Sequence, residues 1–266
     1  MNLIYFIKKY LKKMWNSDEL RKFLSKVNIK EDFIIIHSDV TGLVFPKFDL
    51  KELWKIIFDS FGKNKTYIFP TFTLNNHKKY WSYHQTKSDV GILSEYFRKN
   101  ISSIRTIHPI HSVSIFGKNS FKIPIKHCSS SFGENSFWEW ACTNKNVCNI
   151  SLGLELNGGA TFCHYVEEYC KVPYRKYINL NYIVKDKQNK NTKEKYTYFS
   201  RNTDFKKKII NDWDNVQKVL IKQKLIKIYR NRNPKYKVLK MNTLKVSNFL
   251  IRKVKKNNNF LLKDHL

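Results

Sequence analysis

The chain has 266 residues, of which 42% are hydrophobic and 15% aromatic, and its formal net charge is +29. The length suits one large α/β domain or two small ones, and the apolar content excludes a chain that is disordered throughout. The positive charge attracts polyanions such as nucleic acid, anionic lipid or phosphorylated small molecules, although a coding bias toward lysine would give the same excess without any function.

Residues 1–30 are predicted to be a helical segment made of two helices. Apolar residues recur at helical spacing, and Ser17-Asp18-Glu19 is typical of a restart, a cap followed by early acids. The run from Leu3 to Ile7 is far shorter than the roughly 20 residues of a membrane-spanning helix, and its lysines follow it, in the wrong order for a signal peptide. We expect a helix packed on its own domain, and the alternative is weak association with a membrane surface.

The five cysteines are odd in number and show no paired zinc or CxxC spacing. This pattern is typical of reduced thiols and predicts a cytoplasmic protein.

The next segments alternate between strand and helix patterns. A buried strand is predicted at 33–36, a helix at 50–61 and a second strand at 66–70. Polar residues follow both strands, His37 to Gly42 after the first and Thr71 to Thr73 after the second. This recurrence predicts an α/β sheet, with ligands at the carboxyl ends of its strands.

The middle of the chain continues the pattern. Residues 75–90 are predicted to be a loop crossing over the sheet, followed by a helix that runs to Arg98 and a strand at 113–116. A turn at 132–136 precedes a helix that carries Trp138 and Trp140. We predict another buried strand at 150–154.

The segment after this strand reads as an active site. Asn157-Gly158-Gly159 is a turn, because glycine adopts positive φ at little cost, and Thr161 is a candidate N-cap of the following helix. His164, Glu167 and Glu168 are three and four residues apart on that helix. A structural histidine is the alternative to a catalytic one. A metal pair would need further ligands, which Cys163 and Cys170 do not supply at a recognised spacing, so no metal is predicted.

The last third is the most basic part of the chain. Residues 183–266 hold 24 of the 50 Lys and Arg residues but only 6 of the 21 Asp and Glu residues. The pattern predicts a hairpin from 180–185 and 195–199, a helix over 204–228 with Ile209, Trp213, Val216 and Leu220 on one stripe, and a strand and helix over 237–261. Because no long linker is visible, we expect residues 1–266 to form a single domain that includes the basic part, 178–266.

Taken together, these segments resemble the aminoglycoside 3-N-acetyltransferase family. The matching pieces, in order, are His37-Ser38, Pro70-Thr71-Phe72-Thr73, Gly91-x-Leu93-Ser94-Glu95-x-Phe97-Arg98, Arg105-x-x-His108-Pro109-x-x-Ser112-Val113, Phe132-Gly133-Glu134-x-Ser136, and Leu152-Gly153 followed by Asn157, Thr161 and His164-x-x-Glu167. Phe137 stands where the family usually has proline, and the turn Gly158-Gly159-Ala160 varies in length among relatives. The resemblance implies a single α/β/α layered domain around a central mixed sheet, of the antibiotic N-acetyltransferase type.

The resemblance also implies an acetyl-CoA-dependent transfer of an acetyl group to a primary amine. Such a transfer needs a base for the amine proton, and the family assigns this role to the histidine that matches His164. A carboxylate would orient the ring; Glu167 is slightly favoured over Glu134. His108, in extended backbone before a proline, is a further candidate for the cleft, and a histidine bonded to backbone is the alternative.

Coenzyme A is expected to bind on two strand-end loops, by resemblance and because such loops offer free backbone amides. The expected residues of the first loop are His37, Ser38, Asp39, Val40 and Thr41, and those of the second are Ser112 and Val113, with Arg105 as a partner for phosphate. An acyl intermediate on Cys163 is less favoured than direct attack, because neighbouring residues of a helix point to different faces.

The identity of the acceptor stays open. It is a small-molecule amine, either an aminoglycoside or an amino sugar destined for a surface polysaccharide, for instance as a nucleotide sugar. The net charge favours the second, because aminoglycosides are polycations. A basic protein that binds nucleic acid or a membrane surface on a degenerate enzyme fold is the alternative from another class, but no nucleic-acid motif accompanies the lysines. The sequence leaves the oligomeric state undetermined.

Overall fold

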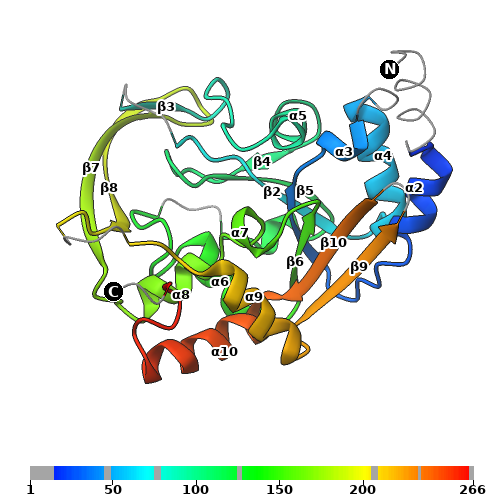
Figure 1. The fold of residues 1–266 in the computed structure, drawn as a ribbon. Coiled ribbons are helices and arrows are strands. Elements are labelled where there is room, and N and C mark those ends of the chain that lie inside the picture. The colour runs from blue at the N-terminus through cyan, green and yellow to red at the C-terminus, as the bar shows by residue number, and fades with distance from the viewer. Residues whose placement is uncertain are drawn as a thin grey trace, which may run out of the picture.

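A mixed sheet forms the centre of the computed structural model, which describes residues 15–44, 49–74, 79–124, 128–204, 209–232 and 235–263. Within these ranges a seven-stranded sheet has the order β4-β5-β2-β1-β6-β10-β9 (Figure 1). Its three parallel strands lie in the middle, and antiparallel strands extend it on both sides. The strands are β1 (Phe33–Ser38), β2 (Thr66–Pro70), β4 (Ile104–Arg105), β5 (Val113–Gly117), β6 (Val147–Leu152), β9 (Ile226–Arg232) and β10 (Lys235–Asn242).

Helices cover both faces of this sheet. In β1, Phe33 and Ile35 belong to one core, while Ile34 and Ile36 belong to the other, because successive side chains of a strand point to opposite faces. One face packs against α2 (Ser17–Leu24), α4 (Leu50–Phe61) and α5 (Ile92–Asn100), and the other against α6 (Phe137–Thr143), α8 (Cys163–Tyr169), α9 (Trp213–Lys222) and α10 (Thr243–Lys256) (Figure 1). The α/β/α layering predicted for the chain is confirmed.

A second, smaller sheet stands beside the first. A long curved hairpin, β7 (Arg175–Lys185) and β8 (Asn191–Arg201), pairs with the short strand β3 (Tyr80–Ser82), as the left side of Figure 1 shows. Trp81, Tyr182, Val184 and Tyr196 form a separate small core. The predicted hairpin is therefore confirmed and is longer than its apolar pattern indicated, whereas β3 lies in a segment that we expected to be a loop.

Most predicted elements appear at their expected places. The helix at 50–61 and the strand at 66–70 have the predicted bounds, and α2 begins at Ser17 with Asn16 and Glu19 forming a capping box. The first helix predicted in residues 1–30 falls largely on residues 1–14, which lie outside the described residues, as do residues 75–78 of the expected crossing loop. Short elements complete the chain: α3 (Thr41–Val44), a 3₁₀ turn η1 (Ser120–Lys122) and α7 (Leu156–Gly159).

The predicted helix over 204–228 is wrong in its length. Among the residues of this range that the structure describes, Trp213–Lys222 is helical, with Val216 and Leu220 buried as expected. Lys224 then adopts a positive φ of 57°, which ends the helix, and Ile226 begins β9. Ile226 pairs with Met241 of β10, and both side chains are buried, so its burial comes from strand pairing and not from a helical stripe.

The sheet brings the ends of β1 and β6 together. These strands are parallel neighbours, and Ser38 lies opposite Leu152 at their carboxyl ends. Gly153 follows with a φ of +75°, and a Cβ there would lie 2.6 Å from the backbone oxygen of Asp39. Only glycine allows this close approach of the two loops. Along the described part of the chain, no helix is long and apolar enough to cross a membrane.

Candidate active site

The site is built at the start of α8, where the chain returns from the carboxyl end of β6. We expected Thr161 to cap this helix, but its side chain makes no capping hydrogen bond. Its hydroxyl lies instead 2.9 Å from Nε2 of His37, at the end of β1. The backbone N–H of His164 donates to the carbonyl of Thr161 at 3.0 Å. The first turn of α8 is thereby joined to the end of a central strand, which fixes the position of His164.

His164 and Glu167 form a hydrogen-bonded pair one helical turn apart. Nδ1 of His164 lies 2.5 Å from Oε2 of Glu167, whose side chain is fully buried, whereas the side chain of His164 is 30% exposed. The imidazole also lies between two aromatic rings, with ring centroids 5.4 Å from Phe132 and 5.8 Å from Trp213. These contacts hold the ring in one orientation.

Glu167 is held as a carboxylate by residues from distant parts of the chain. Its Oε2 accepts from Arg175 at 2.8 Å, and its Oε1 accepts from Asn211 at 2.8 Å and from the hydroxyl of Tyr174 at 3.2 Å. Burial on its own would raise the pKa of Glu167, but His164, Arg175 and these hydrogen bonds outweigh it and lower the pKa to about 2. An ionised carboxylate only accepts hydrogen bonds, so Nδ1 of His164 is the donor and Nε2 of the neutral ring keeps its lone pair.

The exposed part of His164 borders a pocket of about 300 Å³. The lining residues come from the ends of β1 and β2, the start of α5, the loops around β6 and α8, and the hairpin: His37, Ser38, Pro70, Phe72, Leu74, Val90, Ser94, His111, Leu154, Gly158, Thr161, His164 and Tyr198. Burial lowers the pKa of His37 to about 4, and burial together with the nearby His108, His164 and Arg175 lowers that of His111 well below its usual value. Both rings are therefore neutral at pH 7.

The chain matches a known family in its sequence. A family model described as aminoglycoside 3-N-acetyltransferase matches residues 35–240, which is most of the chain. The chain belongs to the aminoglycoside 3-N-acetyltransferase family. The match includes His164 and Glu167. No curated protein matches the sequence.

Several solved structures have the same fold as this member of the aminoglycoside 3-N-acetyltransferase family, although their sequences are only distantly similar. The YokD protein from Bacillus subtilis is 15% identical with a TM-score of 0.73, over 91% of this chain and 100% of that one. A structure described as AAC-VIa bound to sisomicin is 11% identical, and one described as AAC-IIIb binary with CoASH is 13% identical. Both have a TM-score of 0.73 and cover 91% of this chain, with 98% and 97% of their own chains covered.

The first loop expected to bind coenzyme A, residues 37–41, contributes two residues to the pocket that His164 lines. His37 and Ser38 line it. Asp39 turns its carboxylate to the backbone N–H and hydroxyl of Thr41, at 3.0 and 2.6 Å, and Val40 is buried. Of the five residues expected in this segment, His37 and Ser38 are the ones found among the described residues that line the pocket.

The second expected loop lies deeper in the protein. All three of its expected residues, Arg105, Ser112 and Val113, are buried. The guanidinium of Arg105 donates to the carbonyls of Thr71, Tyr83 and Thr86 at 3.1, 3.2 and 2.7 Å, and its Nε donates to Ser112 Oγ at 3.1 Å. A buried guanidinium must satisfy its N–H groups within the protein. The N–H groups of Arg105 that we expected to bind a phosphate therefore donate to these internal oxygens instead.

The histidine that reaches the pocket from this loop is His111 and not His108. Nδ1 of His108 accepts from the backbone N–H groups of Ile110 and His111, at 3.2 and 2.9 Å, as in the alternative that we weighed for it. Nδ1 of His111 lies 2.9 Å from the hydroxyl of Ser131. The sequence analysis missed His111, although a second histidine beside the Ser112 position was a usable signal.

Glu134 does not take part in the histidine pair. It lies in an exposed turn before α6, and the carboxylate that bonds His164 is Glu167. Spacing had left both carboxylates open. The structure brings Glu167 to the histidine because three residues along a helix return to the same face.

Proposed function

We propose that this protein is an acetyl-CoA-dependent N-acetyltransferase in which a primary amine is acetylated directly and His164 is the base. One observation carries the proposal: a buried, ionised carboxylate holds Nδ1 of His164, and the partly exposed His164 side chain lines a pocket. This arrangement is the one that general-base catalysis by histidine requires. The family match and the fold shared with AAC-IIIb, whose structure is described with CoASH, support it.

The residues of the pocket have distinct tasks in this proposal. Acetyl-CoA, when bound, supplies the acetyl thioester. Nε2 of His164 takes the proton that the amine loses as the new C–N bond forms, and the charge of Glu167 stabilises the resulting imidazolium. The proton then passes to the departing sulfur, which leaves as a thiol.

Ser38 fits a role in holding the acyl donor. This residue lines the pocket, and its hydroxyl is buried without a hydrogen-bond partner among the described residues. A buried hydroxyl without a partner costs free energy, and a ligand carbonyl would satisfy it. We propose His37 and Ser38 as the donor-binding residues next to the base, with Asp39, Val40 and Thr41 supplying the shape of the loop.

The lining of the pocket favours an acceptor that carries few positive charges. None of the described residues that line it is Asp or Glu. Aminoglycosides are polycations, and a site for them is expected to offer carboxylates. We therefore propose an amino sugar acceptor, such as a nucleotide-linked one, ahead of an aminoglycoside like the sisomicin bound in the AAC-VIa structure. The ordered pair His164–Glu167 speaks against a degenerate enzyme fold that only binds nucleic acid or membranes.

The first prediction concerns this choice of acceptor. A thiol-release assay with acetyl-CoA is expected to show turnover of at least one phosphorylated or nucleotide-linked amino sugar. Its KM should rise with salt, because screening at a Debye length of about 8 Å at physiological ionic strength weakens attraction to a chain of charge +29. The measurement is kcat/KM for amino sugar nucleotides and aminoglycosides at low and high salt. Turnover of aminoglycosides alone would refute the amino sugar, and no thiol release with any amine would refute the acetyltransferase.

The second prediction concerns Cys163. Its side chain is buried, and burial raises its pKa well above the usual value, which makes it a poor nucleophile. We expect Cys163→Ser to keep the acetyl-transfer rate within about threefold of wild type, the small change expected when no transition-state contact is lost. Mass spectrometry of enzyme quenched during turnover should find no acetyl group on Cys163. An acetylated Cys163 would contradict direct transfer.

A further inference from the structure

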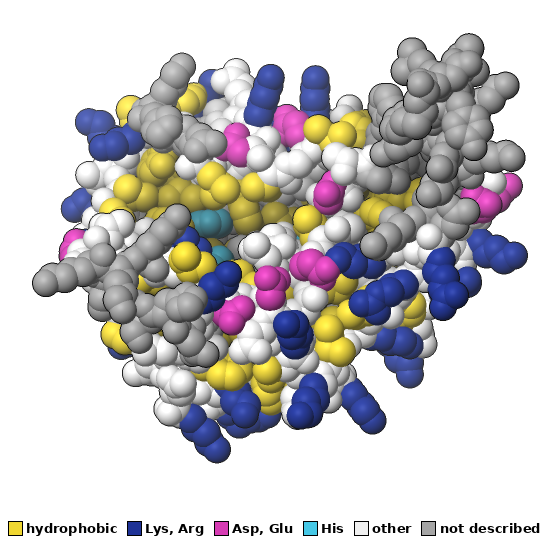
Figure 2. All heavy atoms as spheres, viewed as in Figure 1, with side chains coloured by type: hydrophobic (Ala, Val, Ile, Leu, Met, Phe, Trp, Pro, Cys, Tyr) yellow, Lys and Arg dark blue, Asp and Glu magenta, His cyan; other side chains and the backbone are white. Residues whose placement is uncertain are grey.

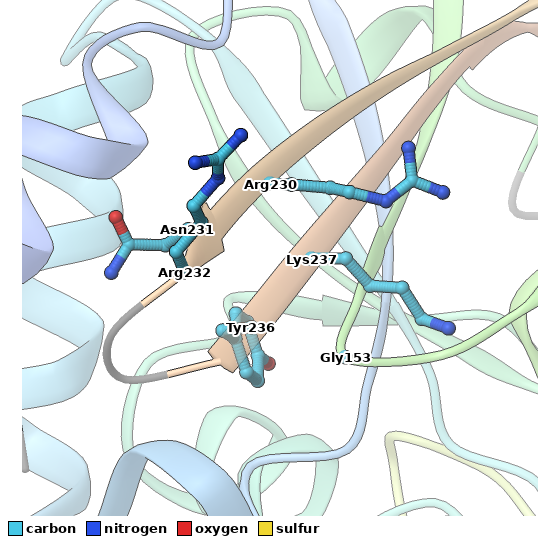
Figure 3. Close-up of a pocket in the computed structure, with 6 residues that line it drawn as sticks. All are labelled: Gly153, Arg230, Asn231, Arg232, Tyr236 and Lys237. Atoms are coloured by element: carbon cyan, nitrogen blue, oxygen red, sulfur yellow. The ribbon is translucent and has the colours of Figure 1, made fainter. Parts of the chain in front are cut away.

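A basic hollow lies on the same loop, at Gly153 and Leu154, as the pocket that His164 lines, on a face where Figure 2 shows many Lys and Arg side chains. It has a volume of about 840 Å³ and is lined by Gly153, Arg230, Asn231, Arg232, Tyr236 and Lys237 (Figure 3). Five of these residues come from the β9–β10 hairpin, in the basic last third of the chain. No acidic residue is among the described residues that line it, so a negatively charged ligand would be attracted by these side chains.

The register of the hairpin gathers the positive charges on one face. Arg230 and Arg232 are two residues apart in β9, so they share a face, and Lys237 of β10 pairs directly with Arg230. Figure 3 shows the long side chains of Arg230 and Lys237 extending to the same side of the hairpin. Like charges directly opposite each other destabilise a pair of strands. Repulsion within such a cluster lowers the stability of the free protein, and a bound anion would offset this repulsion.

Internal ion pairs neutralise only part of this cluster. Lys237 pairs with Glu155, which also accepts from Gln217 at 2.7 Å. Arg230 and Arg232 are exposed and form no ion pair with any residue that the structure describes. Two arginine forks are therefore available, and guanidinium matches the geometry of phosphate oxygens in a bidentate way.

The hollow and the pocket of His164 share the same loops. Gly153 lines the hollow and Leu154, the next residue, lines the pocket. The hydroxyl of Tyr236 donates to the backbone oxygen of Asp39 at 2.8 Å, next to Ser38 of the pocket. Gly153 packs against both, since a Cβ there would lie 2.8 Å from that hydroxyl. A ligand with its reactive end beside His164 can thus extend along this segment toward the arginines.

We propose that Arg230 and Arg232, with Lys237 beside them, form a site for the phosphate groups of a ligand that reaches into the pocket of His164. The shared chemistry is a diphosphate. Two sources can supply it, the nucleotide end of coenzyme A or a nucleotide-linked amino sugar. The site rests on the proposed function only for the identity of its ligand, because the charges, register and position are properties of the hairpin itself.

The test measures binding directly, by isothermal titration calorimetry on the full chain. The probes are coenzyme A, pantetheine, which lacks the phosphates, and uridine diphosphate, which lacks the pantetheine arm. Wild type is compared with Arg230→Ala/Arg232→Ala and with Arg252→Ala, a matched loss of an exposed arginine on α10. We expect the double variant to bind one of the two phosphate-bearing probes at least about tenfold more weakly, the change that corresponds to about 1.4 kcal/mol. Arg252→Ala and the binding of pantetheine should be unaffected.

The outcomes separate the sources. Weaker binding of coenzyme A with no change for uridine diphosphate assigns the site to the acyl donor, and the reverse assigns it to the acceptor. If the double variant binds both probes as well as Arg252→Ala does, the phosphate site is wrong. If the wild type binds and responds in this way but never transfers acetyl, the site stands while the proposed function fails.

Discussion

His164→Ala should lower kcat for acetyl transfer by about two to four orders of magnitude, the range that follows from losing a positioned base. His164 lines the pocket. Two other histidines, His37 and His111, are among the described residues that line it, and burial lowers the pKa of both, which makes them weak bases. Binding of coenzyme A should persist, because alanine removes the base without disturbing Ser38. The measurements are single-turnover acetyl transfer and calorimetric binding of coenzyme A.

A matched control is His84→Ala, which removes an exposed histidine far from the pair in the sequence, bonded through Nε2 to the carbonyl of Lys187 at 3.0 Å. This variant should transfer acetyl at the wild-type rate. Activity of His164→Ala within about threefold of wild type would overturn the assignment of the base, because so small a change corresponds to less than 1 kcal/mol of transition-state stabilisation.

Glu167→Gln should lower kcat by up to about four orders of magnitude, because a side-chain amide can donate to Nδ1 and leave the proton on Nε2, the tautomer that cannot act as base. The variant also loses the charge that stabilises the imidazolium. Glu168→Gln is the control on the same helix. Glu168 accepts a hydrogen bond from the hydroxyl of Ser130 at 2.6 Å and does not bond His164, and the oxygen of an amide can accept the same bond. Equal activities of the two variants would show that Glu167 does not orient the base.

The same variant makes a prediction about acid stability. The pKa of Glu167 is lowered from 4.5 to about 2, so its carboxylate stabilises the fold fully above pH 4.5, and this contribution is lost as the pH falls toward 2. A shift of this size corresponds to about 3 kcal/mol at neutral pH. Urea unfolding gives the free energy of unfolding at pH 7 and at pH 3. The loss of this free energy between pH 7 and pH 3 should be smaller for Glu167→Gln than for wild type. A difference as large as in wild type would mean that other carboxylates cause the acid sensitivity.

The parts of the site that the sequence predicts are those encoded locally. The apolar run of β1 and the apolar stripe of α4 are short-range patterns, and His164 meets Glu167 because both lie on one helix. The partners of Glu167 are of another kind. Arg175 and Asn211 reach it through a hairpin strand and the segment before α9, and no local spacing encodes such contacts.

The same distinction explains the errors. The sequence around Arg105 predicts an exposed cation in a polar loop. In the structure the side chain is buried, and its guanidinium donates hydrogen bonds to backbone carbonyls such as that of Thr86. The helix over 204–228 was overextended because an apolar residue at 226 fits both a helical stripe and a strand, and only the partner strand decides between them. Pairing between strands is a long-range property, so the sequence of one segment cannot contain it.

The hydrogen bonds that support Glu167 also depend on the last third of the chain. His164 and Glu167 are synthesised well before Asn211, which donates to Glu167. One edge of β6 is likewise unpaired until β10 is added beside it. Contacts that close such long loops form late, because their entropy cost comes before their reward. Glu167 therefore lacks its hydrogen bond from Asn211 until the last third of the chain has docked. Under the proposed mechanism, we expect full acetyl transfer to depend on this distant segment as well as on the helix that carries His164 and Glu167.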